Sequence, residues 1–394
     1  MPGPLTGVRV LDLTQAVSGP YATLLMADLG AEVIKIEPFK GDQAREIPSP
    51  MVGDQGSYFV AMNRQKRSIR LNLKSETGRE IFYDCVRKSD VVFDNFRPGV
   101  RERLQIDYQT LAGINPRIIS CSLSAYGATG PYKNKPGYDL IIQALGGGMS
   151  LTGNPGEPPV RMGLPIGDLG GGMCSITGIL AALYEREKSG IGQHIDTSLL
   201  DGQISLLAYQ LTDYHTSLEI PKPHGTGHPS ASVYRMFETK EGYIVVVAHR
   251  EHFFLGLVEA MELPELAIDE RFNHPIGRRD HRKELESILE KVFLEKTAVE
   301  WRKILDKMDV PCATVSTLDQ VMEDEQVLAR KMIVDVDATY GSYKAPGNPI
   351  KMSRTNEERV FPAPFLGEYS EEFLKNVLGY SQEQIDNLID KEII

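Results

Sequence analysis

Short apolar runs alternate with longer amphipathic segments along the first half of the chain. Residues 8–13 are almost continuously apolar, which is typical of a parallel strand buried on both faces. Residues 21–29 predict a helix that begins behind Pro20 and stops at Gly30, and residues 31–36 predict the next strand. Further strands are expected at residues 90–93, 117–122 and 193–197, and helices near 77–87, 101–111, 172–186 and 203–216. This alternation predicts a doubly wound α/β sheet.

The pattern changes after residue 220. Residues 221–230 (PKPHGTGHPS) are typical of a loop, and two β-rich runs then flank the turn 239–242, which predicts a hairpin of residues 233–238 and 243–248. Charge-rich helical segments follow to residue 308, then a strand at 311–316 and helices at 318–329 and 381–390. We therefore predict a large domain over 1–200, a linker over 201–229, a smaller α+β domain over 230–310 and a return to the large domain over 311–394.

Composition is that of a globular protein, with 41% hydrophobic and 25% charged residues among 394. The formal net charge of −11 argues against a general affinity for nucleic acid. No apolar run approaches the roughly 20 residues that a bilayer requires, and the first residues lack the pattern of a secretory signal. We expect a cytoplasmic protein that binds no membrane. The four cysteines are widely spaced, which predicts buried thiols and neither a zinc site nor disulfides.

One carboxylate stands in a glycine-rich segment, GLPIGDLGGGM at residues 163–173. These glycines could open the backbone to a ligand ahead of a helix expected to begin near Gly172. The N–H groups of such a helix would favour an ionised Asp168, which could attack a thioester carbonyl while N–H groups stabilise the oxyanion. The alternative is that Asp168 is a helix N-cap, a role that contributes about 1 kcal/mol. The local sequence alone favours the cap.

Residues 63–74 (NRQKRSIRLNLK) form a basic strip in this acidic protein, and more arginines follow the predicted strand at 90–93. Arginine and lysine pair well with phosphate, so these residues could bind a nucleotide that carries several phosphates. A solvated surface strip is the other interpretation. The cations concerned are Arg64, Lys66, Arg67, Arg70, Lys74, Arg97, Arg101 and Arg103.

Five ordered segments together resemble the family III CoA transferases, the group that includes formyl-CoA transferase and carnitine CoA transferase. They are residues 4–37, NRQKRSIRLNLK, VVFDNFRPGV, GLPIGDLGGGM and GQHIDTSLLD, and the resemblance covers nearly the whole chain. It implies a Rossmann-like large domain built from both chain ends, a smaller domain and an interlocked homodimer, with a heteromer containing a paralogue still open. It also implies an enzyme that moves CoA from a donor such as succinyl-CoA to a carboxylic acid. Coenzyme A is then a substrate, and no permanently bound cofactor or metal is expected.

The same resemblance assigns individual residues by their place in the motifs. Asp168 matches the family nucleophile, which forms aspartyl anhydride and thioester intermediates. Residues 225–227 loosely match a glycine loop that shields the intermediate, although this chain has fewer glycines there. Pro38 stands where the family has a basic residue, for which Lys40 and Arg45 are the candidate replacements. The residues expected to contact CoA are Gln15, Ala16, Val17, Leu71, Lys74, Asn95, Arg97, Arg103 and Tyr138.

Three other functions are alternatives to CoA transfer. An acyl-CoA racemase or isomerase of the same superfamily needs an acid/base pair, and racemases place a histidine where this chain has Tyr138. A nucleotide-dependent dehydrogenase needs GxGxxG after the first strand, whereas residues 15–19 hold a single glycine. A non-catalytic subunit would be expected to lose Asp168. His224 and His228, in the loop 221–230, are either active-site groups or ordinary polar loop residues.

Overall fold

The computed structural model describes residues 2–355 and 359–394, and the chain divides into two compact units. Unit 1 comprises Met1–Gly148, Arg161–Leu218 and Glu325–Ile394, and unit 2 comprises Met149–Val160 and Glu219–Asp324. These boundaries differ from the predicted ones. The expected linker at 201–229 contains most of α8 (Leu199–Ser205) and all of α9 (Tyr209–Ser217). It belongs to unit 1 as far as Leu218, because α8 packs on α7 (Ile166–Ser189).

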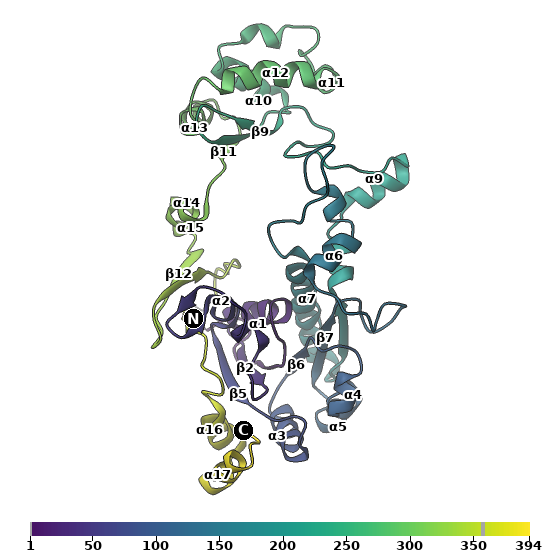
Figure 1. The fold of residues 1–394 in the computed structure, drawn as a ribbon, viewed down its shortest axis with the longest axis vertical. Coiled ribbons are helices and arrows are strands. Elements are labelled where there is room, and N and C mark those ends of the chain that lie inside the picture. The colour runs from purple at the N-terminus through teal and green to yellow at the C-terminus, as the bar shows by residue number, and fades with distance from the viewer. Residues whose placement is uncertain (1, 356–358) are drawn as a thin grey trace. The chain divides into compact units, whose positions relative to one another are not determined.

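Unit 1 is built on a six-stranded sheet in the order β5-β2-β1-β6-β7-β8, with every neighbouring pair parallel (Figure 1). The strands are β1 Arg9–Asp12, β2 Glu32–Glu37, β5 Lys66–Arg70, β6 Val91–Asp94, β7 Ile119–Ser124 and β8 His194–Ser198. The chain builds outward from β1 in one direction and then returns to add β6 on its other side. The predicted doubly wound sheet is therefore confirmed, and its topological switch point lies between β1 and β6.

Helices cover both faces of this sheet. On one face, α1 (Ser18–Asp28) and α7 pack against a core that includes Val10, Phe93 and Cys121. On the other face, Leu11, Ile34 and their neighbours pack against α3 (Glu76–Arg87) and the C-terminal helices α16 (Ser370–Phe373) and α17 (Gln382–Asp390). The C-terminal residues thus complete unit 1, as the resemblance implied.

Long apolar helix α7 is the only helix among the described residues that is long and apolar enough to cross a bilayer, by length and composition. The sequence predicts a shorter helix here, at residues 172–186. Half of the stretch concerned is buried within the protein, as in the core helix of a globular domain. Its apolar character is therefore accounted for by packing against the sheet and α1.

Unit 2 contains a three-stranded antiparallel sheet in the order β11-β10-β9. Strands β9 (Tyr234–Glu238) and β10 (Tyr243–Val247) form the predicted hairpin, and β11 is Cys312–Thr314. The sheet and helices share one core around Trp301, whose indole N–H donates to the Phe293 carbonyl at 2.8 Å. The main helices are α10 Glu251–Ala260, α11 Pro275–Asp280, α12 Arg282–Phe293 and α13 Ala298–Lys307.

Some predicted elements are wrong in detail. The helix expected at 101–111 is two helices, α4 (Val100–Leu104) and α5 (Tyr108–Ile114), because Gln105 adopts a left-handed conformation (φ 57°) and Asp107 caps the second helix. Two of the four cysteines are not buried, since Cys174 is exposed and Cys312 is partly exposed.

The other α-helices and strands of unit 1 are α2 Ser57–Asn63, α6 Asp139–Leu145, α9 Tyr209–Ser217, α15 Glu325–Ala329 and the small strands β3 Met51–Val52, β4 Gln55–Gly56, β12 Ile333–Val336 and β13 Tyr343–Pro346. Helix α14 (Leu318–Glu323) belongs to unit 2.

Candidate active site

The loops that follow β1 and β6 meet at the switch point of the sheet. The Gln15 N–H donates to the Asn95 side-chain oxygen at 2.9 Å, and the Asn95 side-chain N–H donates back to the Gln15 carbonyl at 2.8 Å. Ligands of doubly wound folds bind at this carboxyl edge, beside the switch point. The structure therefore brings residues 15–17 together with Asn95, as expected for a shared CoA site, and Arg97 follows two residues later on the same loop.

Asp168 lies in the first turn of α7, which begins at Ile166, six residues earlier than predicted. Pro165 occupies the N-cap position without a side-chain hydrogen bond, so the prediction that Asp168 could be the N-cap is wrong. The role belongs to Asp139, the first residue of α6. Its Oδ1 accepts the N–H of Gly167 at 2.9 Å and that of Asp168 at 3.3 Å. Pro165 and Gly167 are weak helix formers, which concealed this start in the sequence.

Asp139 also acts on the charge of Asp168. Burial, and then the negative charge of Asp139, raise the pKa of Asp168 to about 7. From the sequence, the N–H groups of the helix terminus are expected to favour an ionised Asp168. In the structure, burial and the charge of Asp139 favour the protonated form and raise the pKa instead. Tyr58 of α2 faces the same negative charges, since burial and then Asp168 raise its pKa as well. Asp168 is thus a partly buried, unusually basic carboxylate.

The glycines after Asp168 serve helix packing and not ligand access, contrary to the prediction. A Cβ added at Gly172 would lie 2.6 Å from the Ser18 carbonyl oxygen of α1, and one at Gly171 would lie 2.7 Å from the side chain of Leu199 in α8. Both distances are shorter than non-bonded contacts allow. The glycines therefore let α1 and α8 approach α7 closely. This packing fixes the start of α7, and with it Asp168, beside the loop that follows β1.

The other residues expected to contact CoA differ in their accessibility. Lys74, Arg97, Arg103 and Tyr138 are exposed, and the Tyr138 side chain lies at the start of α6 beside Asp139. Val17 is buried at the start of α1, and the Leu71 side chain is buried in the core. Leu71 could therefore meet a ligand only through its main chain, whose N–H already donates to the Glu37 carbonyl.

Part of the basic strip is structural. Residues Lys66–Arg70 form edge strand β5, which was not predicted from the sequence. Arg64 is buried in an ion pair with Asp28 at 2.5 Å, and Lys66 in one with Asp12 at 3.1 Å, so neither can bind phosphate. Arg45 is similarly engaged, because it donates to both carboxylate oxygens of Glu37. Lys40 is exposed and remains the candidate for the missing basic residue.

Residues 225–227, the candidate shielding loop, belong to unit 2. The Gly225 N–H donates to the Gly153 carbonyl at 2.9 Å, and Arg282 donates to the His228 carbonyl at 2.8 Å. The loop borders a cavity of about 830 Å³, which His224 also lines. His228 instead stacks on Tyr234, with ring centroids 5.1 Å apart. These contacts anchor the loop within unit 2.

The chain is similar to known proteins over nearly its whole length. The chain is 40% identical to the acetyl-CoA:oxalate CoA-transferase of Acetobacter aceti, over 93% of this chain and 94% of that protein. It is 35% identical to the succinyl-CoA:glutarate CoA-transferase of Mus musculus, over 99% and 90%. A crystal structure of a CAIB/BAIF family protein from Brucella suis matches with a TM-score of 0.87 and 33% identity, over 95% of this chain and all of that one. The model of CoA-transferase family III matches residues 5–370. The chain therefore belongs to CoA-transferase family III and is a CoA-transferase.

Proposed function

We propose that Asp168 is the nucleophile of this CoA-transferase. The observation that carries the proposal is its position: a basic, partly buried carboxylate in the first turn of α7, fixed beside the loop after β1. A carboxylate with a pKa near 7 is a stronger nucleophile than an ordinary aspartate, and it is still about half ionised at neutral pH. At neutral pH, Asp168 is therefore ionised in a large fraction of molecules and is also a stronger nucleophile than an ordinary aspartate.

The reaction conserves the energy of the thioester through exchange. The Asp168 carboxylate attacks the donor carbonyl, the C–S bond breaks, and CoA thiolate leaves an acyl-aspartyl anhydride. The thiolate then attacks the aspartyl carbonyl, which releases the donor acid and forms an aspartyl-CoA thioester. The acceptor carboxylate attacks the aspartyl carbonyl of this thioester, the C–S bond breaks, and a second anhydride joins the acceptor to Asp168. The released thiolate then attacks the acceptor's acyl carbon, which forms the new acyl-CoA and frees the Asp168 carboxylate. Water must be excluded throughout, because it would hydrolyse either intermediate.

The CoA site in this proposal lies along the carboxyl edge of the sheet. The loop 15–17 and Asn95 would contact the part of CoA that lies near the switch point, with Tyr138 near the acyl group. Exposed Lys74, Arg97 and Arg103 are available to pair with its phosphates. Their exposure supports the proposal, because an unpaired surface cation can bind phosphate without first breaking a buried ion pair.

For substrates we propose a succinyl-CoA-like donor and a small dicarboxylate acceptor. The names of the two relatives give oxalate and glutarate as acceptors, and both acids are dicarboxylates. Their donors differ, so the donor is less constrained than the acceptor. Which acid this chain accepts depends on the shape of its pocket and on one or two charges.

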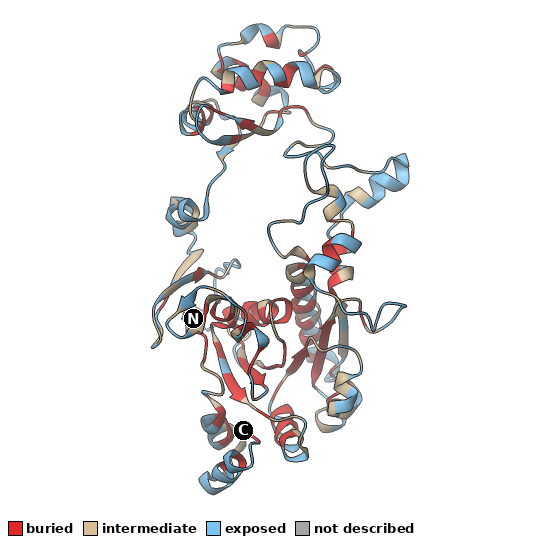
Figure 2. Ribbon diagram, viewed as in Figure 1, coloured by how far each residue is buried: buried red, intermediate tan, exposed pale blue. Residues whose placement is uncertain are grey.

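A homodimer is also proposed, on the basis of helix α9. No residue of this nine-residue helix is buried, and it exposes Tyr209, Leu211 and Tyr214 (Figure 2). A helix shorter than about 12 residues is marginal in water without packing. Exposed apolar side chains continue on α6 and α8 of the same unit. A second copy of the chain that covers this surface would supply the missing contacts.

The proposed chemistry is tested by the full-length Asp168→Ala variant with a panel of acyl-CoA donors and dicarboxylates, read by mass spectrometry. We expect transfer to fall at least about a thousandfold while CoA still binds. Transfer near the wild-type rate would overturn the assignment of Asp168. Solvent deuterium that enters the α-position of an acyl-CoA without any acceptor would instead support a racemase.

A further inference from the structure

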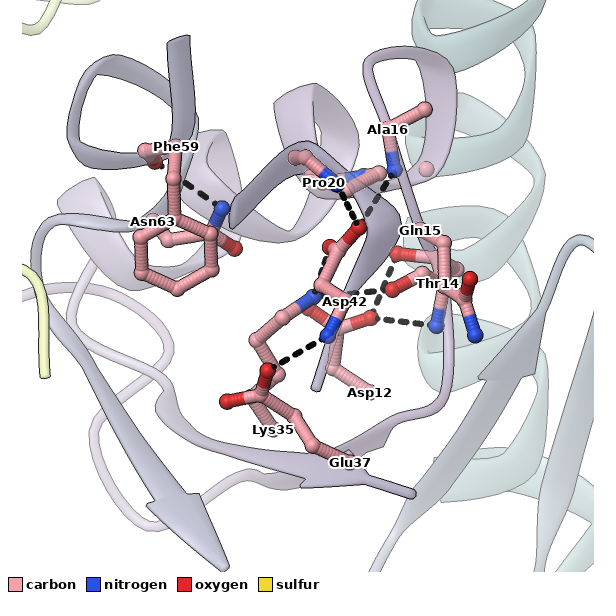
Figure 3. Close-up of polar contacts among 12 residues, drawn as sticks. Asp12, Thr14, Gln15, Ala16, Pro20, Lys35, Glu37, Asp42, Phe59 and Asn63 are labelled. Atoms are coloured by element: carbon pink, nitrogen blue, oxygen red, sulfur yellow. Dashed lines mark hydrogen bonds and ion pairs between the residues drawn. The ribbon is translucent and has the colours of Figure 1, made fainter. Parts of the chain in front are cut away.

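A buried cluster of charges lies directly beneath the loop that follows β1 (Figure 3). Asp12, Lys35, Glu37, Asp42 and Lys66 are each no more than 3% exposed. Buried ion pairs contribute little to stability on balance, because desolvation offsets their attraction, and well-packed apolar replacements are often as stable. Stability alone therefore does not explain five such residues in one cluster. Buried ionic groups can instead specify one conformation of the backbone around them.

The cluster forms hydrogen bonds with the main chain of the loop. Lys35 Nζ donates to the Thr14 carbonyl at 2.8 Å and forms an ion pair with Asp42 Oδ2, also at 2.8 Å. Asp42 Oδ1 in turn accepts the Ala16 N–H at 3.1 Å. The main chain of two loop residues, Thr14 and Ala16, is thus bound to a single ion pair. Figure 3 shows both ties converging on Asp42 and Lys35.

Ala16 needs such a tie because its φ is +67°. A side chain in this left-handed region is strained, and the conformation persists only where the surroundings enforce it. Strain of this kind gathers at functional sites. Burial alone would lower the pKa of Lys35, but Asp42, Asp12 and Glu37 outweigh burial and raise it. Lys35 therefore stays protonated, and its ties to Thr14 and Asp42 are maintained.

We infer that Lys35 and Asp42 are positioning residues that hold the loop 14–17 in the conformation that binds the CoA thioester. This inference rests on the proposed function, in which the same loop contacts CoA. Neither residue touches the reacting atoms in this account. A loop released from the ion pair would spend only part of its time in the binding conformation, and the apparent affinity would fall by that fraction. Once CoA is bound, the chemistry at Asp168 would proceed as before.

The test is the full-length double variant Lys35→Met/Asp42→Leu, which removes both charges together and leaves neither one unpaired. We expect the KM for the acyl-CoA to rise about tenfold, with kcat changed less than about threefold. Adding Ala16→Gly should recover part of the affinity, because glycine adopts a positive φ without strain. A matched control is Arg64→Met/Asp28→Leu, which removes a buried ion pair of the same unit that makes no contact with the loop. Its KM should stay within about twofold of the wild type.

The Arg97→Ala variant separates failure of this inference from failure of the proposed CoA site. If Arg97→Ala raises KM and the Lys35/Asp42 double variant does not, the positioning role is wrong and the CoA site stands. If neither changes KM, the CoA site itself is misplaced and both proposals fall. An equal rise of KM in the Arg64/Asp28 control would also overturn the inference, because the effect would then be general destabilisation.

Discussion

Asp139, the first residue of α6, contacts the first turn of α7, where Asp168 lies 29 positions later in the chain. Asp139 satisfies two N–H groups of that turn and at the same time repels the charge of Asp168. The identity of Asp168 as the candidate nucleophile could be predicted from its motif. Its ionisation could not, because burial and the approach of Asp139 depend on how α6 packs against α7. The local features, a helix start and several glycines, predicted the wrong direction for the pKa.

The Asp139→Asn variant separates these two roles of Asp139. The amide oxygen can still accept the N–H groups of α7, but the negative charge is gone, so the pKa of Asp168 should fall. In the wild type, the ionised fraction of Asp168 grows as pH rises through about 7, and kcat should rise with it. In Asp139→Asn this rising limb should move to lower pH, although burial keeps it above that of an ordinary aspartate. A pH profile of kcat between pH 5 and 9 checks this, and an unmoved limb would show that Asp139 does not tune Asp168.

At the scale of elements, the strands of the sheet were predicted well where they are apolar on both faces. Strand β1 and strand β2 lie within one or two residues of their predicted bounds. Strand β5 was missed because its polar residues resemble a surface strip, and only the fold reveals that Lys66 is buried against Asp12. The start of α7 was also missed. A glycine run usually indicates a loop, whereas here it indicates a helix packed closely on both sides.

Gly172 offers a direct test of that close packing. In Gly172→Ala, the new methyl group would press against the Ser18 carbonyl and force α1 away from α7. We expect a loss of about 1–3 kcal/mol in the free energy of unfolding, and reduced transfer, because Asp168 and the loop after β1 would separate. Urea denaturation and steady-state kinetics measure the two effects. Gly163→Ala is the matched control, since no atom lies within 4 Å of its added Cβ; equal losses in both variants would refute the packing role.

At the scale of the whole molecule, the sequence indicated two domains and a C-terminal return to the first of them. Units 1 and 2 follow that plan, although Met149–Val160 joins unit 2 and Glu325 begins the return. These differences in the unit boundaries depend on which loops pack together, and the hydrophobic pattern of the sequence does not determine loop packing. The proposed pairing of two copies could not be predicted from hydrophobic periodicity either. The exposed apolar side chains of α9, which continue on α6 and α8, indicate that the single chain leaves a surface uncovered.

The Leu211→Glu/Tyr214→Lys variant tests the role of α9. The wild type should elute as a dimer in size-exclusion chromatography with light scattering, and the variant should be monomeric or strongly weakened in association, because charges would enter an apolar interface. Ile268→Glu, at an exposed apolar residue of unit 2, is the control and should remain dimeric. A monomeric wild type would contradict the proposed dimer.

The most direct test of the central claim is chemical trapping of the aspartyl-CoA thioester. Hydroxylamine added during turnover should convert the thioester to a hydroxamate, which peptide mass spectrometry can locate. The account predicts a hydroxamate on Asp168 only when an acyl-CoA is present, and none in the Asp168→Asn variant. A hydroxamate on a different residue, or sustained transfer with no modification of Asp168, would contradict it.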